Sequence, residues 1–400
     1  MLKTIKQIPN LSGKTVLVRV DFNVPIKRKK VLDDTRLLAH LPTIKYLVEK
    51  KAKIILLTHV GRPGGKVVAS LRVDPIVEEL GKLLKKKVKK LETGSWKLDD
   101  KKKLVVLKDI EKMKPGQVAM MENIRFSPDE KKDTGTLSQE LANLADYFAL
   151  DGFAVAHRDS ASVSGIAKHI PAYAGLLLEK EIKGLSRVTQ NPKGPFVVVL
   201  GGAKMETKIP VIKNLLPKAD YILIGGGIVN TYLKAKGFKV GASLIDKEYE
   251  KEVLKYCKSK KVIKPVDVVV GDVKGKKYKV VKLNKIKKLC SKDEAIYDIG
   301  PETIRLYAKY IKQAQTLIWN GAMGYFEQKP YDVGTLSVAR LVASRSKGKA
   351  FGVIGGGETL QAMDMVGMSD DIDLISTGGG AMLEFLSGKE LPGVKAVSKK

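Results

Sequence analysis

Short apolar segments alternate with amphipathic segments along almost the whole chain, and this alternation restricts the fold more than any other feature. Between the first two apolar segments, residues 34–51 repeat their apolar side chains at helical spacing after an acidic start. Strands that alternate with helices predict parallel β-sheets with helices on both faces. The predicted strands are residues 15–21, 53–57, 118–121, 196–200, 221–224, 266–270, 316–319, 351–354 and 373–376.

The length of 400 residues exceeds what one hydrophobic core usually serves, so we expect two domains. A second amphipathic helix is predicted through Leu137, Leu141, Leu144 and Phe148. A further helical stretch at 172–190 is followed by the segment NPKGP at 191–195. This is the best candidate for the joint between the two domains.

The chain is strongly basic, with 73 Lys and Arg against 43 Asp and Glu and a formal net charge of +30. Lysine runs at 82–90, 101–103, 258–261 and 273–288 raise the possibility of nucleic-acid binding. We favour a solvated lysine-rich surface, because the runs are dispersed over both halves and lack interleaved aromatic residues. Such a charge would still concentrate anionic substrates.

Location and redox chemistry are restricted by what the sequence lacks. No apolar run approaches the roughly 18 residues of a membrane span, and the first ten residues lack the apolar stretch of a signal peptide. We therefore expect a soluble, cytoplasmic protein. Cys257 and Cys290 show no metal-site or disulfide spacing and are interpreted as packing residues.

The residues that follow the predicted strands differ between the two halves of the chain. Ligands of open α/β sheets bind at the carboxyl ends of the strands, so these residues are the functional candidates. In the first half they are polar and basic: Asp21, Asn23, His59, Arg62, Asn123, Arg125, His157 and Arg158. With Arg36, the arginines predict a cradle for a small carboxylate or phosphate ester.

In the second half the same positions hold glycine-rich loops. They are GGAK at 201–204, GGG at 225–227, NGAMG at 320–324, GGGET at 355–359 and TGGGA at 377–381. Glycine lets the backbone approach phosphate closely, and amides at a helix start bind anions. So many loops exceed what turn chemistry alone requires. The second half therefore predicts a nucleotide site.

Other phosphate-handling motifs do not fit this sequence. The order of residues in GGAKMETK at 201–208 is not that of a P-loop. HRD at 157–159 and DFN at 21–23 stand in the wrong order for a protein kinase, and no GxGxxG loop precedes them. The absence of GxGxxG followed by an acidic residue also weakens a dehydrogenase interpretation.

The motifs that remain resemble those of phosphoglycerate kinases in order and approximate spacing. They are VRVDFNVP at 18–25, DDTR at 33–36, THVGRP at 58–63, ENIRF at 122–126, FAVAHR at 153–158, LGGAK at 200–204, IGGG at 224–227, WNGAMGYFE at 319–327, GGGET at 355–359 and STGGGA at 376–381. The resemblance implies two doubly wound, Rossmann-like domains joined by a hinge. Residues 1–172, with 388–400 returning to them, would bind 3-phosphoglycerate, and residues 173–387 would bind ATP or ADP.

The resemblance also implies roles for individual residues. The acid-substrate site would comprise Asp21, Asn23, Arg36, His59, Arg62, Arg125 and Arg158. The nucleotide site would comprise Gly201, Gly202, Lys204, Lys208, Gly225, Gly226, Asn320, Glu327, Gly356, Gly357, Glu358 and Thr359, with Glu358 as the contact to Mg2+. Arg36, Lys204, Gly379 and Gly380 would stabilise the phosphoryl group in transfer between 1,3-bisphosphoglycerate and ADP.

Several positions depart from the family pattern. Glu358 replaces the usual Asp, Ala322 replaces Pro and Met382 replaces Ser, while LDGF at 150–153 and Asp159–Ser160 replace NDAF and an Ala-His pair. These changes resemble an archaeal-like branch. Two alternatives stay open from the sequence: a kinase-like protein with altered acid specificity, and a lysine-rich nucleic-acid-binding α/β protein.

Overall fold

The computed structural model describes residues 2–91, 100–132, 136–284 and 287–399, and for residues 100–104 it describes the backbone alone. The side chains of the lysine run at 101–103, and residues 285–286 of the run at 273–288, thus lie outside the described part. The chain divides into two compact units. Unit 1 runs to Ile182 and includes the residues from Glu390 onward, and unit 2 is Lys183–Lys389. The first division falls within α5 (Leu176–Thr189).

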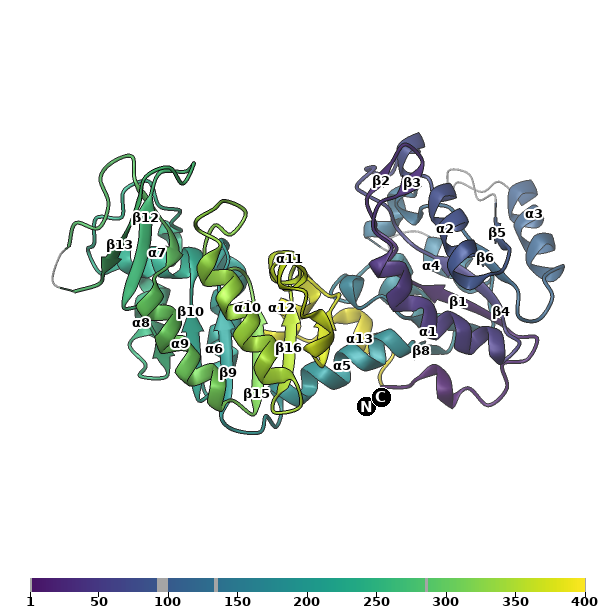
Figure 1. Cartoon of the computed structure of the whole chain (residues 1–400). Helices are drawn as coiled ribbons and strands as arrows, with labels where there is room; N and C mark the ends of the chain where they lie inside the picture. Colours follow the sequence, from purple (N-terminus) through teal and green to yellow (C-terminus); the bar gives the residue numbers. More distant parts are fainter. Residues whose placement is uncertain (1, 92–99, 133–135, 285–286, 400) are drawn as a thin grey trace. The chain divides into compact units, whose positions relative to one another are not determined.

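Unit 1 is built on a six-stranded parallel sheet in the order β5-β6-β4-β1-β7-β8 (Figure 1). Its strands are β1 (Thr15–Arg19), β4 (Lys53–Leu57), β5 (Val88–Lys90), β6 (Val118–Met120), β7 (Tyr147–Leu150) and β8 (Ala172–Ala174). Its helices are α1 (Thr35–Glu49), α2 (Asp74–Leu84), α3 (Asp100–Glu111), α4 (Leu137–Ala142), the first part of α5 and α13 (Pro392–Ala396). Every residue of β1 is buried, so both faces of the sheet centre are covered.

The last residues of the chain belong to unit 1. The Lys3 amide donates to the carbonyl of Val397 at 2.8 Å, and the Gly393 amide donates to that of Ala156 at 2.8 Å. Gly393 also approaches Leu150 so closely that a Cβ there would lie 2.7 Å from its side chain.

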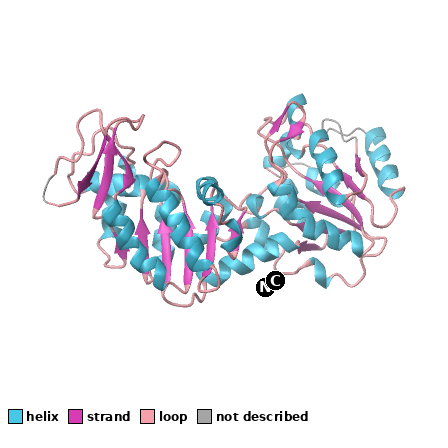
Figure 2. Ribbon diagram, in the orientation of Figure 1, coloured by secondary structure: helices cyan, strands magenta, loops and turns pink. Residues whose placement is uncertain are grey.

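Unit 2 contains a second six-stranded parallel sheet, in the order β11-β10-β9-β15-β16-β17. Its strands are β9 (Phe196–Leu200), β10 (Tyr221–Ile224), β11 (Val262–Ile263), β15 (Thr316–Asn320), β16 (Phe351–Gly355) and β17 (Leu374–Ser376). Its helices are α6 (Met205–Leu215), α7 (Gly226–Ala235), α8 (Glu250–Cys257), α9 (Pro301–Gln313), α10 (Val333–Ser346), α11 (Gly357–Val366) and α12 (Gly380–Leu386). Helices cover both faces of the sheet (Figure 2). The order reverses between β9 and β15, which is where a doubly wound sheet opens a crevice.

The structure confirms the predicted fold class and corrects three local predictions. Residues 266–270 were expected in a parallel sheet, but β12 (Asp267–Gly271) pairs antiparallel with β13 (Tyr278–Lys282) and β14 (Ala295–Ile299). Phe148 lies in β7 rather than in a helix with Leu137, because α4 ends at Ala142. The stretch 172–190 begins with β8 before α5 starts. Buried strands and buried helices share apolar runs that periodicity alone does not separate.

Among the described residues, none of the helices combines the length and apolar character that a bilayer span requires. Cys257 and Cys290 are free and buried. Burial raises the pKa of the Cys257 thiol to about 12 and that of the Cys290 thiol to about 11, so both remain protonated at neutral pH.

Candidate functional site

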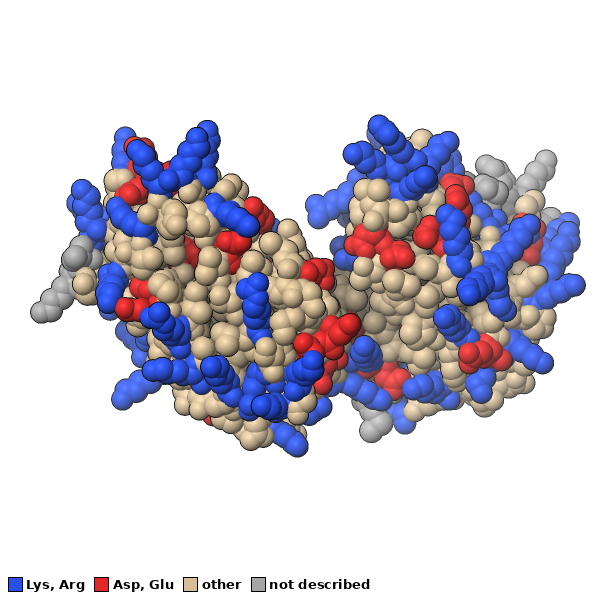
Figure 3. Space-filling view, viewed as in Figure 1, with Lys and Arg blue, Asp and Glu red and all other residues tan. Residues whose placement is uncertain are grey.

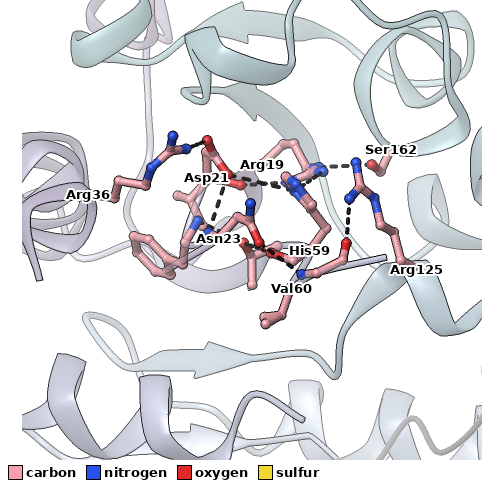
Figure 4. Close-up of polar contacts among 12 residues, drawn as sticks. Arg19, Asp21, Asn23, Arg36, His59, Val60, Arg125 and Ser162 are labelled. Atoms are coloured by element: carbon pink, nitrogen blue, oxygen red, sulfur yellow. Dashed lines mark hydrogen bonds and ion pairs between the residues drawn. The ribbon is translucent and has the colours of Figure 1, made fainter. Parts of the chain in front are cut away.

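A hydrogen-bonded cluster of charged residues lies at the carboxyl ends of the central strands of unit 1 (Figure 4). Asp21, just after β1, forms an ion pair with Arg36 from the first turn of α1. His59, after β4, places Nδ1 3.7 Å from the other carboxylate oxygen of Asp21. Arg19, the last residue of β1, donates to His59 Nδ1 at 3.3 Å. Four of the polar side chains in this cluster therefore come from neighbouring strand ends and one helix.

His59 is held neutral in this cluster. Burial lowers its pKa well below the ordinary value, and the positive charges of Arg19, Arg158 and Arg36 lower it further. Since Arg19 donates to Nδ1, the proton of the neutral ring is on Nε2. His59 can thus donate one hydrogen bond to a ligand without adding charge.

Three of the predicted arginines line one cavity of about 430 Å³ in unit 1. They are Arg62, Arg125 and Arg158, and Lys131 lines the same cavity. Burial, and then the charge of Arg62, lower the pKa of Arg158, although an arginine remains protonated in proteins. A cavity with this many fixed cations suits an anion that carries more than one charge.

The buried carboxylate of Glu130 lines the same cavity. It accepts hydrogen bonds from Ser162 Oγ at 2.6 Å, the Ser162 amide at 3.0 Å and Ser160 Oγ at 3.1 Å. Ser162 lies in a single π-helical turn, η6 (Ala161–Gly165), and its hydroxyl accepts from Arg19 Nε at 2.8 Å. Burial raises the pKa of Glu130 and burial lowers that of Arg19 to about 10. Glu130 thus fixes the turn that follows Arg158.

Asn23 and Arg125 hold the loop after β4. Asn23 Oδ1 accepts from the Gly61 amide at 2.8 Å, and Arg125 Nη1 donates to the Gly61 carbonyl at 2.5 Å. Asn123 accepts from the Val60 amide at 3.1 Å. These contacts fix the loop that carries Arg62.

In unit 2 the first three glycine loops pack directly against one another. Gly202 donates to the carbonyl of Ala322 at 2.7 Å, Gly226 to that of Met323 at 2.8 Å, and Gly227 to that of Gly202 at 3.0 Å. A Cβ on Gly201 would lie 2.0 Å from the Ala322 carbonyl oxygen. Part of the glycine content therefore serves contact between backbones and not contact with a ligand.

Other glycines face open space. A Cβ on Gly357, Gly379 or Gly380 would meet no atom within 4 Å. Gly356 and Gly379 have φ angles of 97° and 50°, and each precedes the first residue of its helix, α11 or α12. The first amides of a helix have no intrahelical acceptor, so these loops offer free N–H donors to an anion.

Lys204, the N-cap residue of α6, and Lys208, inside that helix, differ in environment. Lys204 is exposed at the N-cap, whereas Lys208 is 6% exposed and its Nζ donates to Asn320 Oδ1. Burial lowers the pKa of Lys208 to about 8, against the opposing charge of Glu358. Asn320 is buried and also donates to the Gly355 carbonyl at 2.5 Å. It therefore joins Lys208 to the loop before α11.

Glu358 and Thr359 begin α11 and reach toward the loop after β15. Glu358 Oε2 accepts from the Ala322 amide at 3.3 Å, and Thr359 Oγ1 accepts from the Gly321 amide at 2.7 Å. Thr359 is fully buried, so its side chain braces the loop from within. Gly225 is likewise packed, since a Cβ there would lie 2.9 Å from the Cα of Met323.

A second cavity, of about 380 Å³, opens above these loops. Gly202, Gly226, Glu327 and Glu358 line it, as predicted residues of the nucleotide site. The remaining walls are mostly apolar, with Leu244, Val268, Ile296, Tyr297 and Tyr325 among them. An apolar cavity beside open helix amides matches a ligand with a flat base and a phosphate chain.

Residues 5–389 match the family described as phosphoglycerate kinase. The chain belongs to the phosphoglycerate kinase family. The phosphoglycerate kinase of Moorella thermoacetica is 43% identical over 404 residues, which cover 99% of each chain. The structure of phosphoglycerate kinase from Coxiella burnetii is 37% identical, with a TM-score of 0.87 and 99% of each chain covered. That from Pyrococcus horikoshii OT3 is 33% identical, with a TM-score of 0.82, and covers 99% of this chain and 98% of its own.

Membership of the phosphoglycerate kinase family establishes the function. The protein is a glycolytic phosphotransferase with a carboxyl group as acceptor, and it interconverts 1,3-bisphosphoglycerate and ADP with 3-phosphoglycerate and ATP. Neither open alternative is favoured, because full-length similarity includes both sets of strand-end loops.

Several residues that line the two cavities or the charged cluster escaped the sequence analysis. They are Arg19, His40 and Glu130 in unit 1 and Tyr297 and Tyr325 in unit 2. Arg19 lies within the motif VRVDFNVP, and a guanidinium at the end of the apolar segment TVLVR was a further signal, since a buried strand rarely tolerates an unpaired charge. The others lie outside the strand-end motifs or become relevant only through contacts distant in sequence.

Proposed function

We propose that unit 1 binds the acid substrate and unit 2 binds the nucleotide. The observation that carries this division is the contrast between the two cavities, one lined by Arg62, Arg125 and Arg158 and the other by glycine loops and apolar side chains. A small, highly charged acid suits the first, and a base with a phosphate chain suits the second.

Phosphoryl transfer requires in-line positioning and dispersal of charge rather than covalent help from the protein. We assign the acid to Asp21, Asn23, Arg36, His59, Arg62, Arg125 and Arg158, as the sequence motifs suggest. Lys204, exposed at the start of α6, and the open amides of Gly379 and Gly380 would disperse charge on the transferred group. Arg36 would contribute from the acid side.

Magnesium is proposed as the metal of the reaction. Among the described residues there is no cluster of three or more His, Cys, Asp or Glu that could hold a metal by itself. The carboxylate of Glu358 fits magnesium, which binds through one or two carboxylates plus substrate phosphates and keeps several waters. Magnesium would supply charge neutralisation at the phosphate oxygens, and Glu358 would help to hold the ion.

The position within the family and the location in the cell are proposals too. The replaced positions Ala322, Glu358 and Met382 support the archaeal-like branch, and the similar proteins include a bacterial one at 43% identity and an archaeal one at 33%. A cytoplasmic location agrees with a glycolytic reaction. Lys and Arg are scattered over both units on the face drawn in Figure 3, with acidic residues among them, and this dispersal supports a solvated surface over a nucleic-acid groove.

A coupled assay tests the proposal. With 3-phosphoglycerate, ATP and Mg2+, turnover should require all three components. Other small acids, such as acetate or glycerate, should replace 3-phosphoglycerate poorly because they lack the second anionic group. Equal turnover with glycerate would contradict the role proposed for the arginine cavity.

A further inference from the structure

One face of α1 carries three polar side chains at the spacing i, i+4 and i+7: Arg36, His40 and Thr43. Residues at this spacing lie along one side of a helix. His40 is 2% exposed and Thr43 is fully buried. Buried polar groups need partners, and these find theirs at the ends of three neighbouring strands.

His40 contacts two of those strand ends. Its Nε2 accepts from the backbone amide of Asp21 at 3.0 Å, and its Nδ1 lies 2.5 Å from Asp151 Oδ2. Because Nε2 accepts, the ring proton is on Nδ1 and is donated to Asp151. The imidazole of His40 and the ring of Phe22 pack edge to face, with ring centroids 5.4 Å apart. This contact fixes the plane of the imidazole.

Asp151 continues the connection to the start of α5. Its Oδ1 accepts from Thr43 Oγ1 at 2.7 Å and from the Leu177 amide at 3.0 Å. Thr43 Oγ1 accepts in turn from the Leu176 amide at 2.9 Å. A Cβ on Gly175 would lie 2.1 Å from the Asp151 carboxylate, so the carboxylate packs directly against the chain that enters the helix.

We infer that His40 is a positioning residue, which holds the acid-binding loop at Asp21 and, through Asp151, the first turn of α5. This inference rests on the proposed function, since it takes Asp21 and Arg36 as contacts of the acid substrate. Helix α5 carries the chain from unit 1 into unit 2. Binding of the acid at Asp21 is therefore transmitted to the helix that joins the units.

Three substitutions separate the two ends of this connection. His40→Leu removes both polar contacts. His40→Gln can place its amide oxygen near the position of Nε2 and keep the Asp21 contact, whereas His40→Asn can reach the position of Nδ1 and keep the Asp151 contact. His169→Gln is the matched control, because His169 is an exposed histidine of the same unit whose hydrogen-bond partner is Ser138.

The measurements are KM for each substrate and hydrogen exchange of the amides of Asp21, Leu176 and Leu177, with and without 3-phosphoglycerate. We expect His40→Leu and His40→Asn to raise KM for 3-phosphoglycerate roughly tenfold with KM for ATP little changed, as expected when a buried donor loses its partner. His40→Gln should keep KM near the wild-type value. It should lose the response of the Leu176 and Leu177 amides to 3-phosphoglycerate, and His40→Asn should lose this response too, because each variant breaks the connection at one end.

The inference is overturned if His40→Gln and His40→Asn both retain the wild-type KM and the wild-type amide response. If His40→Leu does not fold, these two variants still decide the result. Exchange of the Asp21 and Leu177 amides in the ligand-free protein tests the connection without substrate. Absence of turnover in the wild-type enzyme would overturn the proposed function instead, and so the two failures differ.

Discussion

At the scale of single residues, lysines in different surroundings have different roles, and Lys204 is the clearest case. It is exposed at the N-terminus of α6, where a cation is not needed for stability. We expect Lys204→Ala to lower kcat by a factor on the order of 10² with smaller changes in KM, as for a cation directed at transition-state charge. Steady-state kinetics would check this, with the exposed Lys213→Ala on the same helix as control. A loss confined to KM would make Lys204 a binding residue only.

Lys208 should couple nucleotide binding to pH. Burial lowers its pKa to about 8, from 10.5, so in the free protein the amine loses its proton as the pH rises through about 8. Nucleotide phosphates favour the ammonium form, and binding at pH 8 should therefore take up roughly half a proton. Affinity should fall as the pH rises from 7 to 9. Calorimetry in buffers of different ionisation enthalpy measures the uptake, and Lys208→Met should abolish it. An unchanged uptake in that variant would assign the proton to another group.

The same lowered pKa has a consequence for folding. The unfolded chain binds more protons at Lys208 than the folded chain between about pH 8 and 10.5, so this residue makes stability rise with pH in that window. Below about pH 8 the buried charge costs stability in full.

Glu358 should determine the magnesium requirement. Its carboxylate lines the nucleotide cavity and contacts the Ala322 amide at 3.3 Å. Glu358→Gln should raise the magnesium concentration for half-maximal activity, since an amide binds magnesium more weakly than a carboxylate, and Glu358→Asp should retain activity. Titration of activity with magnesium at fixed ATP is the measurement. If the Gln variant kept its magnesium dependence, Glu358 would be a helix-start residue alone.

At the scale of elements, the proposed function assigns the two substrates to loops of different units. Arg62 follows β4 and lines the cavity of unit 1 with two other arginines. Arg62→Ala should raise the dissociation constant of 3-phosphoglycerate at least tenfold and leave that of ADP unchanged. The reason is that a charge-assisted contact is lost in one unit only. Calorimetry with each ligand checks this, with the exposed Lys66→Ala from the same loop as control. Equal losses for both ligands would contradict the division.

At the scale of the whole molecule, the proposed function gives each unit a site for only one of the two substrates. Transfer requires the two ligands to meet without water. We expect 3-phosphoglycerate and ADP together to lower the radius of gyration more than either ligand alone. Small-angle scattering on the free, singly and doubly liganded protein would detect this. An unchanged radius in the doubly liganded protein would remove closure from the mechanism.

The sequence by itself determined the strands that lie in the sheet interiors and the loops that follow them. Residues 54–57, 196–200 and 222–224 are apolar throughout because both faces of a parallel strand are covered, and this pattern is local. The glycine loops and strand-end arginines are local as well, because the backbone conformation and charge they provide belong to single residues.

Only the tertiary structure decided which residues meet. Phe148 is in a strand because β7 pairs with β1 and β8, and residues 267–271 are antiparallel because β13 and β14 flank them. Arg19, Glu130 and Ser162 form one buried hydrogen-bonded cluster although they are far apart along the chain. His40 bonds to Asp151 across 111 positions. Burial sets the charge and partners of such groups, and burial depends on elements that no local pattern brings together.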